Sequence, residues 1–454
     1  MKSFITTIKN IWKIKELRER ILFTLLILLV YRFGTYVLLP GVDRIALEAS
    51  TSNSAPTDIL SMINAFAGGA FNRAAFFALG IMPYITASII VQLLGFAVPY
   101  FQKLQQKEGE SGRKKLTQIT RLLTLAITLV QGGAYLSWIK SQGAIDPNIP
   151  ESIFWISNVI ILSSGTIFAM WLGERITDRG IGNGISLLIM IGIIATLPQA
   201  FVFELTSQMA SGGLLIFVIE IAALFAITMV CVLIVQGIRK IPIQFAKRMV
   251  GRSSNIPVQG ARDYIPIKVA AAGVMPIIFA QALMFLPSTV SQYFMGQTAS
   301  PTGFMAQLTD ISSLPYNVIY FILVVVFTYV YTALLVNPKQ YAEYLKRQNA
   351  FIPGIKPGKP TQDFIDAVTT RVTLPGSIFL GLIAILPAIV TVFGVNQLFA
   401  YFFGGTSLLI IVGVVLDTLQ QIESYLLMRK YDGLVKSGKI KGRSSSMQTI
   451  GSDL

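Results

Sequence analysis

The chain has 454 residues, of which 53% are hydrophobic and 13% are charged, and its formal net charge is +15. It contains no histidine and one cysteine, Cys231. These counts exclude zinc-protease sites, His-dependent acid–base catalysis and an intramolecular disulfide. We therefore expect a protein that crosses a membrane several times, with no enzymatic activity and no metal or cofactor.

Several apolar runs approach or exceed the roughly 20 residues that a helix needs to cross a bilayer. The first run lacks a small-residue cleavage site, so we interpret it as a retained span and not as a signal peptide. The sequence predicts ten spans in all. They lie near residues 21–39, 75–98, 122–139, 154–172, 185–203, 213–236, 269–288, 316–336, 372–394 and 398–416.

The basic residues predict the orientation, because Lys and Arg in loops are retained on the cytoplasmic side during insertion. One side of the predicted topology has only Arg44, Arg73 and Lys140, and the other side has nearly all the rest. Both termini are then cytoplasmic, in a multi-pass protein of the cytoplasmic (inner) membrane. Topology and anionic lipid account for most of the positive charge, so we do not expect DNA as a partner.

A six-residue phrase occurs twice, as GIMPYI at 80–85 and as GVMPII at 273–278. The copies lie in the second and seventh spans, which run in opposite directions. Proline inside a span frees a backbone carbonyl, and such breaks at matching places indicate a transport path. Five spans per half is an odd number, so we predict two pseudo-symmetric inverted five-helix halves, 1–203 and 204–426, followed by a cytoplasmic tail, 427–454.

A short apolar segment at about 60–72 precedes the second span and stops at Gly68 and Gly69. It is too short to cross a bilayer. A glycine hinge would let this helix dip back into the protein from outside. The alternative is an interfacial helix that lies on the outer leaflet.

Two charged residues, Arg32 and Glu220, fall within predicted spans, and a third, Asp417, lies at the inner end of the tenth span. Intramembrane carboxylates are functional candidates by default, which singles out Glu220 and Asp417. Asp417 lies close enough to the cytoplasmic interface to be solvated, and Glu220 has no specific predicted role beyond solvation through a tilted helix. Arg32, in the first span, is expected to pair with an acid.

Six long phrases follow one another in the chain: AGGAFNRAAFFALGIMPYITASIIVQLL, KEGESGRKKLTQITR, MWLGERITDRGIGNGISLLI, RKIPIQFAKR, FIPGIKPGKPT and FGGTSLLIIVGVVLDTLQQIES. Together they resemble the SecY/Sec61 alpha family of protein-conducting channels over nearly the whole chain. The resemblance implies an all-α clamshell, hinged between the fifth and sixth spans. It also implies an hourglass pore that a plug closes on the outer side.

The resemblance also implies three sets of site residues. The plug comprises Leu60, Ile63, Phe66, Gly68, Gly69 and Asn72. The pore ring comprises Ile81, Ile85, Ile185, Ile189, Ile278 and Ile410. A lateral gate, between the second and third spans and the seventh and eighth, is held shut by mutual hydrogen bonds of Thr86, Ser88, Gln131 and Gln281. A ring of branched aliphatic side chains blocks ions by dewetting and holds no passing peptide.

No phosphate-binding Walker A pattern occurs, so a partner must supply the energy. The resemblance implies that the cytoplasmic loops 237–268 and 337–371 bind the SecA motor ATPase or the ribosome. The docking residues would be Arg239, Lys240, Lys247, Arg248 and Lys356. SecE and SecG are the membrane subunits that it implies, and polypeptides with signal sequences are the substrates.

The expected function is passage of unfolded secretory polypeptides through the plugged pore, with release of membrane segments through the lateral gate. A secondary transporter is the alternative, because inverted repeats and broken helices occur there too. Such proteins usually carry polar ligands for an ion or solute at the midplane. A ring of isoleucine suits a small polar solute poorly.

Overall fold

The computed structural model describes residues 12, 14–47, 64, 66–106, 109–245, 262–294, 307–308, 310 and 312–436. Each of the ten predicted spans coincides with a helix in this part of the chain. In chain order these helices are α2 (Lys15–Gly34), α5 (Met82–Ala97), α7 (Gly109–Ser141), α8 (Glu151–Arg179), α9 (Gly184–Ser211), α10 (Leu214–Gln236), α11 (Met275–Phe294), α13 (Leu314–Leu335), α15 (Lys359–Val392) and α17 (Gly405–Lys436). Shorter helices are α6 (Pro99–Gln106), α14 (Pro338–Arg347) and α16 (Gln397–Phe403).

Seven of these helices in the described ranges are long and apolar enough to cross a membrane: α7, α8, α9, α10, α13, α15 and α17. The remaining three have identifiable reasons to fall short. The apolar stretches of α5 and α11 are each shorter than 18 residues. α2 carries charged residues near both ends, including Glu16 and Arg32. The chain is thus an α-helical polytopic membrane protein.

The repeated phrase marks two helix starts, not two broken helices. Gly80 and Gly273 have φ angles of 53° and 62°, in the left-handed region that glycine tolerates best. α5 and α11 begin two residues later, so Pro83 and Pro276 occupy the second helical position. A proline there lacks an N–H group that would be unpaired anyway, so no carbonyl is freed. The expected break by proline inside each helix was therefore wrong, and turns interrupt these two crossings before the helices begin.

The second crossing is consequently part helix and part turn. α5 has 16 residues, a rise of about 24 Å at 1.5 Å per residue, which is less than the thickness of a bilayer core. The residues from 67 to 81 before it form turns, apart from one bridge residue, Ala75. The helix therefore begins later than the predicted span over 75–98, and the seventh span differs in the same way over 269–274.

Two further boundaries differ from the prediction because glycines, and not the ends of apolar runs, set the helix ends. α9 continues past the predicted border at 203/204 and ends at Ser211, where Gly212 caps it with a φ of 73°. The predicted tenth span is divided between α16 and α17, with Gly405 at φ 63°. α17 then runs to Lys436, inside the predicted tail, and residues 437–454 lie outside the described ranges.

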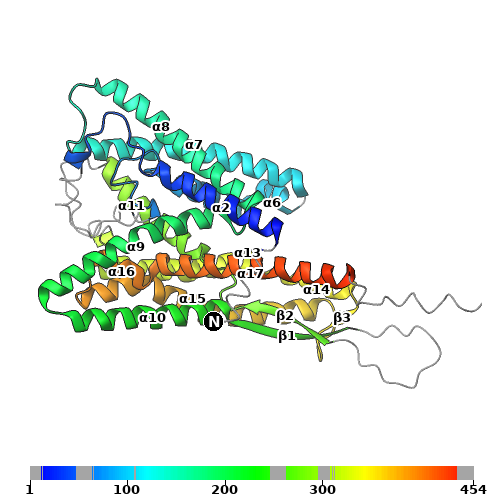
Figure 1. Ribbon diagram of the computed structural model, residues 1–454. Coiled ribbons are helices and arrows are strands. Elements are labelled where there is room, and N and C mark those ends of the chain that lie inside the picture. Colours follow the sequence, from blue (N-terminus) through cyan, green and yellow to red (C-terminus); the bar gives the residue numbers. More distant parts are fainter. Residues whose placement is uncertain are drawn as a thin grey trace, which may run out of the picture.

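The helices form two groups that lie one above the other in Figure 1. In one group α7 packs on α5 and α8, and α8 packs on α2. In the other α13 packs on α11 and α15, and α16 packs on α15 and α17. α9 joins the groups by contacting α2 and α8 on one side and α10, α16 and α17 on the other. This arrangement is a clamshell with its turn between α9 and α10.

A small sheet departs from the all-α prediction. β1 (Ile238–Phe245) pairs antiparallel with β2 (Arg262–Lys268) and, at its other edge, with β3 (Ala350–Phe351). Ile241 and Ile243 of β1 are buried in a cluster that includes Ile365 of α15, which explains why this predicted loop is ordered as strands. The sheet lies at one end of the molecule (Figure 1), here called the sheet end.

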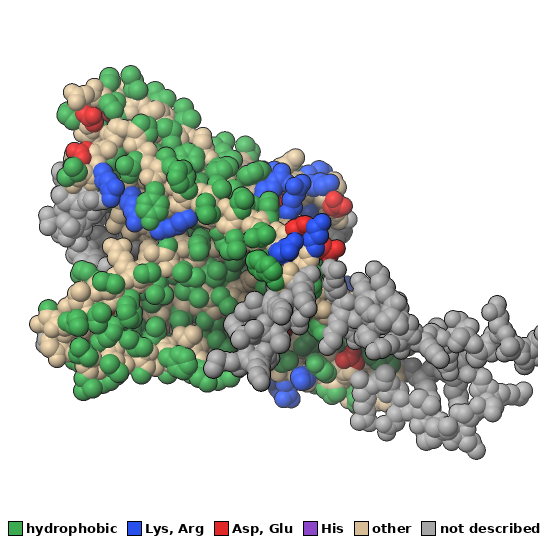
Figure 2. Space-filling view, viewed as in Figure 1, with side chains coloured by type: hydrophobic (Ala, Val, Ile, Leu, Met, Phe, Trp, Pro, Cys, Tyr) green, Lys and Arg blue, Asp and Glu red, His purple; other side chains and the backbone are tan. Residues whose placement is uncertain are grey.

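Side-chain types are segregated along the same axis. Hydrophobic side chains cover the middle of the face seen in Figure 2, and Lys and Arg gather toward its ends. Large apolar residues that face outward include Leu29, Leu122, Leu215 and Phe225, which are 69%, 71%, 75% and 69% exposed. An apolar surface of this extent suits the hydrocarbon core of a bilayer.

Candidate pore constriction and plug

The six predicted ring residues belong to a single hydrophobic cluster. They come from α5, α9, α11 and α17, so both halves of the molecule contribute. Ile81, Ile85, Ile189 and Ile410 are buried, and Ile185 and Ile278 are partly buried. Each lies directly before its helix or within the first two turns. The structure thus brings together all six residues that the resemblance selected.

Local sequence fixes where these helices begin and hence which way the isoleucines face. At the start of α9 the Asn183 side chain accepts hydrogen bonds from the N–H groups of Ile185 and Ser186, at 3.2 and 3.4 Å. This cap satisfies two otherwise unpaired donors. Residues four apart share one helix face, so the cap aims Ile185 and Ile189 in the same direction.

The described end of the predicted plug contacts this cluster. Phe66 is a buried member of it and, with Ala67, lines a small cavity together with Ile81, Ile85 and Ile189. Leu60 and Ile63 lie outside the described residues. The predicted helix over 60–72 is too long, because turns begin at residue 67.

Glycines and one asparagine end the plug helix. Gly68 and Gly69 have φ angles of 65° and 85°, which a right-handed helix does not accommodate. The N–H of Gly69 donates to the Asn64 carbonyl at 2.8 Å, and the N–H of Asn72 donates to Asn64 Oδ1 at 3.0 Å. These bonds fold the segment after the plug back on itself.

Two neighbouring helices fix the end of the plug. Arg32 of α2 donates through Nη1 to the Gly68 carbonyl at 2.7 Å and through Nη2 to the Tyr36 hydroxyl at 3.3 Å. Gly192 of α9 packs so closely that a Cβ atom there would lie 2.3 Å from the Phe66 carbonyl oxygen. The expected acidic partner of Arg32 was wrong: a backbone carbonyl takes that place, and sequence spacing gives no signal for it.

Known proteins share the sequence and the fold that contain this ring and plug. The family model described as SecY matches residues 75–419. The chain belongs to the SecY family. Its relatives include the protein translocase subunit SecY of Streptomyces coelicolor, 42% identical over 95% of this chain and 100% of the relative, and that of Chlamydia muridarum, 38% identical over 96% and 99%.

Solved structures have the same fold. A structure described as that of a protein-conducting channel superposes with a TM-score of 0.65 at 20% identity, over 92% of this chain and 94% of that one. Sec61 in a canine ribosome–channel complex gives a TM-score of 0.62 at 19% identity, over the same shares. A SecY structure whose plug domain is described as stabilising the closed channel gives 0.60 at 20% identity, again over 92% and 94%.

The hydrogen bonds predicted across the lateral gate of this SecY-family chain do not form between the four residues in the described structure. The Thr86 hydroxyl donates to the Met82 carbonyl at 3.0 Å, and Gln92 Nε2 donates to the Ser88 hydroxyl at 3.1 Å, all within α5. A hydroxyl in a helix readily bonds the carbonyl four residues earlier, so it needs no partner across the seam. α11 nevertheless contacts both α5 and α7, which lie on the opposite side of the predicted gate.

The predicted docking residues lie at the sheet end where the structure describes them. Arg239 and Lys240 are exposed on β1, and Lys240 Nζ lies 4.7 Å from the centre of the Tyr264 ring. Lys356 is exposed in the turn between β3 and α15. Lys247 and Arg248 lie outside the described residues.

Glu220 lies in a buried polar cluster at the turn between the halves, not in solvent. Gln208 Nε2 donates to Glu204 Oε1 at 2.8 Å and to Glu220 Oε1 at 3.3 Å. The other oxygen of Glu204 accepts from the Asn396 N–H at 3.0 Å. Glu204 and Glu220 are 1% and 5% exposed. Sequence reasoning missed Glu204, whose i,i+4 spacing to Gln208 was the available signal.

Proposed function

We propose that this chain is the channel subunit of a protein translocase, through which unfolded secretory polypeptides cross the cytoplasmic membrane. The observation that carries the proposal is the isoleucine cluster, drawn from both halves, with Phe66 of the plug packed into it. Such a ring dewets a narrow pore and offers no hydrogen bond that would retain a peptide. The plug closes it, and opening requires Phe66 to leave.

The two halves give the path its exits. Separation of α5 and α7 from α11 and α13 opens a seam toward lipid, through which signal sequences and membrane segments leave the pore. The turn at Gly212 between α9 and α10 serves as the hinge, and the buried Glu204–Gln208–Glu220 cluster beside it ties both helices to the loop before α16. Thr86, Ser88, Gln131 and Gln281 are the polar residues of this seam, and Thr86 and Ser88 bond within α5.

Transport into proteoliposomes tests the proposal against the secondary-transporter alternative. The full chain, reconstituted with the expected SecE and SecG subunits and a SecA motor, is expected to import a secretory polypeptide in an ATP-dependent way. Vesicles that contain the chain alone are expected to take up no small polar solute above the level of empty vesicles. Solute uptake by the chain alone, without polypeptide import in the full system, would support the transporter instead.

The sheet end is proposed to face the cytoplasm and to bind the SecA motor or the ribosome, with both termini on that side. The canine Sec61 and yeast Ssh1 structures similar to this chain are described as ribosome complexes. Arg239, Lys240 and Lys356 present exposed positive charge there, which suits the polyanionic surface of a ribosome or acidic patches of a motor. The same charge attracts anionic lipid of the cytoplasmic leaflet.

Charge reversal at the sheet end tests this surface. Arg239→Glu is expected to weaken motor or ribosome binding at least tenfold, because it replaces attraction by repulsion at an exposed site. The loss should shrink as salt is raised, since salt screens exposed charges. Arg44→Glu, on the predicted outer side, is the matched control and should leave binding unchanged. If the unaltered chain and both variants bind equally well, Arg239 is not part of the docking surface.

A further inference from the structure

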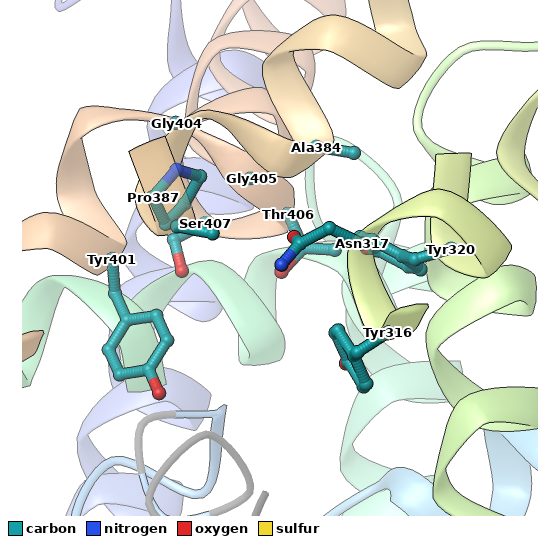
Figure 3. Close-up of a pocket in the computed structure, with 11 residues that line it drawn as sticks. Tyr316, Asn317, Tyr320, Ala384, Pro387, Tyr401, Gly404, Gly405, Thr406 and Ser407 are labelled. Carbon is teal, nitrogen blue, oxygen red and sulfur yellow. The ribbon is translucent and has the colours of Figure 1, made fainter. Parts of the chain in front are cut away.

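A pocket that several hydroxyl groups line lies among α13, α15, α16 and α17, apart from the ring and the plug. Its lining includes Tyr316, Tyr320, Tyr401, Thr406, Ser407 and Pro387. Figure 3 shows the Ser407, Asn317, Tyr316 and Tyr401 side chains around the same space. None of these residues has a role in the proposed translocation pathway, so the pocket calls for its own explanation.

The start of α17 forms one wall of the pocket. Gly404 packs so closely on α15 that a Cβ atom there would lie 2.9 Å from the Ile383 carbonyl oxygen, and Gly405 takes a φ of 63° with Pro387 at 3.1 Å from its own Cβ position. This pair of glycines lets the helix begin directly against α15. The first N–H groups of a helix have no partner within it and carry partial positive charge.

A second, independent feature points to a ligand. Tyr320 is 3% exposed and lines the pocket, and its hydroxyl has no hydrogen-bond partner in the described structure. Thr406 and Ser407, which are 2% and 6% exposed, place two further hydroxyl groups in the lining of the same pocket. Buried polar groups almost always have partners, so an orphaned hydroxyl in a cavity indicates an occupant.

The lining identifies the class of occupant. It offers hydroxyl groups and helix N–H groups as donors, and no carboxylate lies among the residues around the pocket. A cation would meet the positive end of the α17 dipole with no negative partner. A phosphate dianion would lack the Lys or Arg that such a charge requires. Hydroxyl and N–H donors beside a helix start, with no carboxylate in the lining, suit a small monovalent anion.

We propose that this pocket binds a halide, with chloride as the physiological ion, held by the Tyr320 and Ser407 hydroxyls and the first N–H groups of α17. The ion would tie α13 to the start of α17. Ile410 of the ring is five residues beyond Gly405, about 7.5 Å along the helix. Chloride therefore stabilises the segment that positions this ring residue.

Halide titration of the full chain in detergent or nanodiscs tests the proposal. Replacement of gluconate by chloride at constant ionic strength is expected to raise the Tm by about 3–5 °C, because a ligand that binds only the folded state stabilises it. In crystals grown with bromide, an anomalous peak is expected within hydrogen-bond distance of the Tyr320 hydroxyl. Tyr320→Phe should weaken the chloride effect at least tenfold and remove the peak.

Tyr135→Phe is the matched control, because that buried hydroxyl donates to the Phe71 carbonyl at 2.6 Å, far from the pocket. It should lower the Tm in both salts and leave the chloride dependence intact. A Tm that is independent of chloride, or density for water with no bromide peak, would overturn the proposal. An equal loss of chloride dependence in both tyrosine variants would overturn it as well.

Discussion

Replacement of Gly192 by alanine is expected to make the closed channel leak ions. The added Cβ would lie 2.3 Å from the Phe66 carbonyl oxygen, far inside van der Waals contact, so one side must move. α9 is a continuous helix across this position and gains helix propensity from alanine, roughly 1 kcal/mol. The end of the plug, which is held by a few hydrogen bonds, is therefore the part that yields.

Conductance in planar bilayers checks this prediction. We expect the resting ion conductance of Gly192→Ala to exceed that of the unaltered channel at least tenfold. Gly376→Ala is the matched control, because its Cβ would lie 2.4 Å from the Val269 carbonyl oxygen in the other half of the molecule. That variant should lose stability and remain sealed. A sealed Gly192→Ala channel, or equal leaks in both variants, would contradict the proposal that the end of the plug packs against Gly192 to close the channel.

Loss of the Arg32 guanidinium is expected to have the second large effect. The 2.7 Å bond from Arg32 to the Gly68 carbonyl is charge-assisted, and such bonds contribute about 1.5–3 kcal/mol. Arg32→Leu removes the donor, so the open-plug population should rise roughly 10- to 100-fold. Single-channel recording measures it as open probability.

Arg20→Leu is the control for the second effect. Arg20 lies on the same helix and also donates to a backbone carbonyl, that of Gly180 at 3.3 Å, but this bond joins α2 to the turn before α9 and not to the plug. Its loss should lower stability with no change in open probability. If both arginine variants open equally, the effect comes from loosening α2 and not from release of the plug.

The sequence was sufficient for those features that depend on local patterns. Apolar runs located all ten helices, and the family phrases selected six isoleucines that the structure places in one cluster. Helix ends were less predictable, because they depend on the backbone angles of single glycines. Gly80, Gly273 and Gly405 each take a left-handed φ where an apolar run continues without interruption.

Contacts between distant segments were the part that the sequence could not supply. The Arg32 bond spans 36 residues and ends on a carbonyl, which every residue possesses. Asn396 joins Glu204 across 192 residues, and the Tyr320 pocket needs four elements to close. The hydrogen bonds predicted across the gate do not form because nearby partners are available. Thr86 and Ser88 bond residues one turn away within α5.

Site-specific photo-crosslinking tests most directly whether a translocating polypeptide passes the isoleucine ring. A photo-reactive residue at Ile85, which is 8% exposed and adjoins the plug cavity, would be compared with one at Leu122, which is 71% exposed on α7. With a secretory polypeptide stalled part-way through export, we expect capture at Ile85 and none above background at Leu122. Equal capture at both positions, or no capture at Ile85 despite confirmed stalling, would contradict the path through the ring.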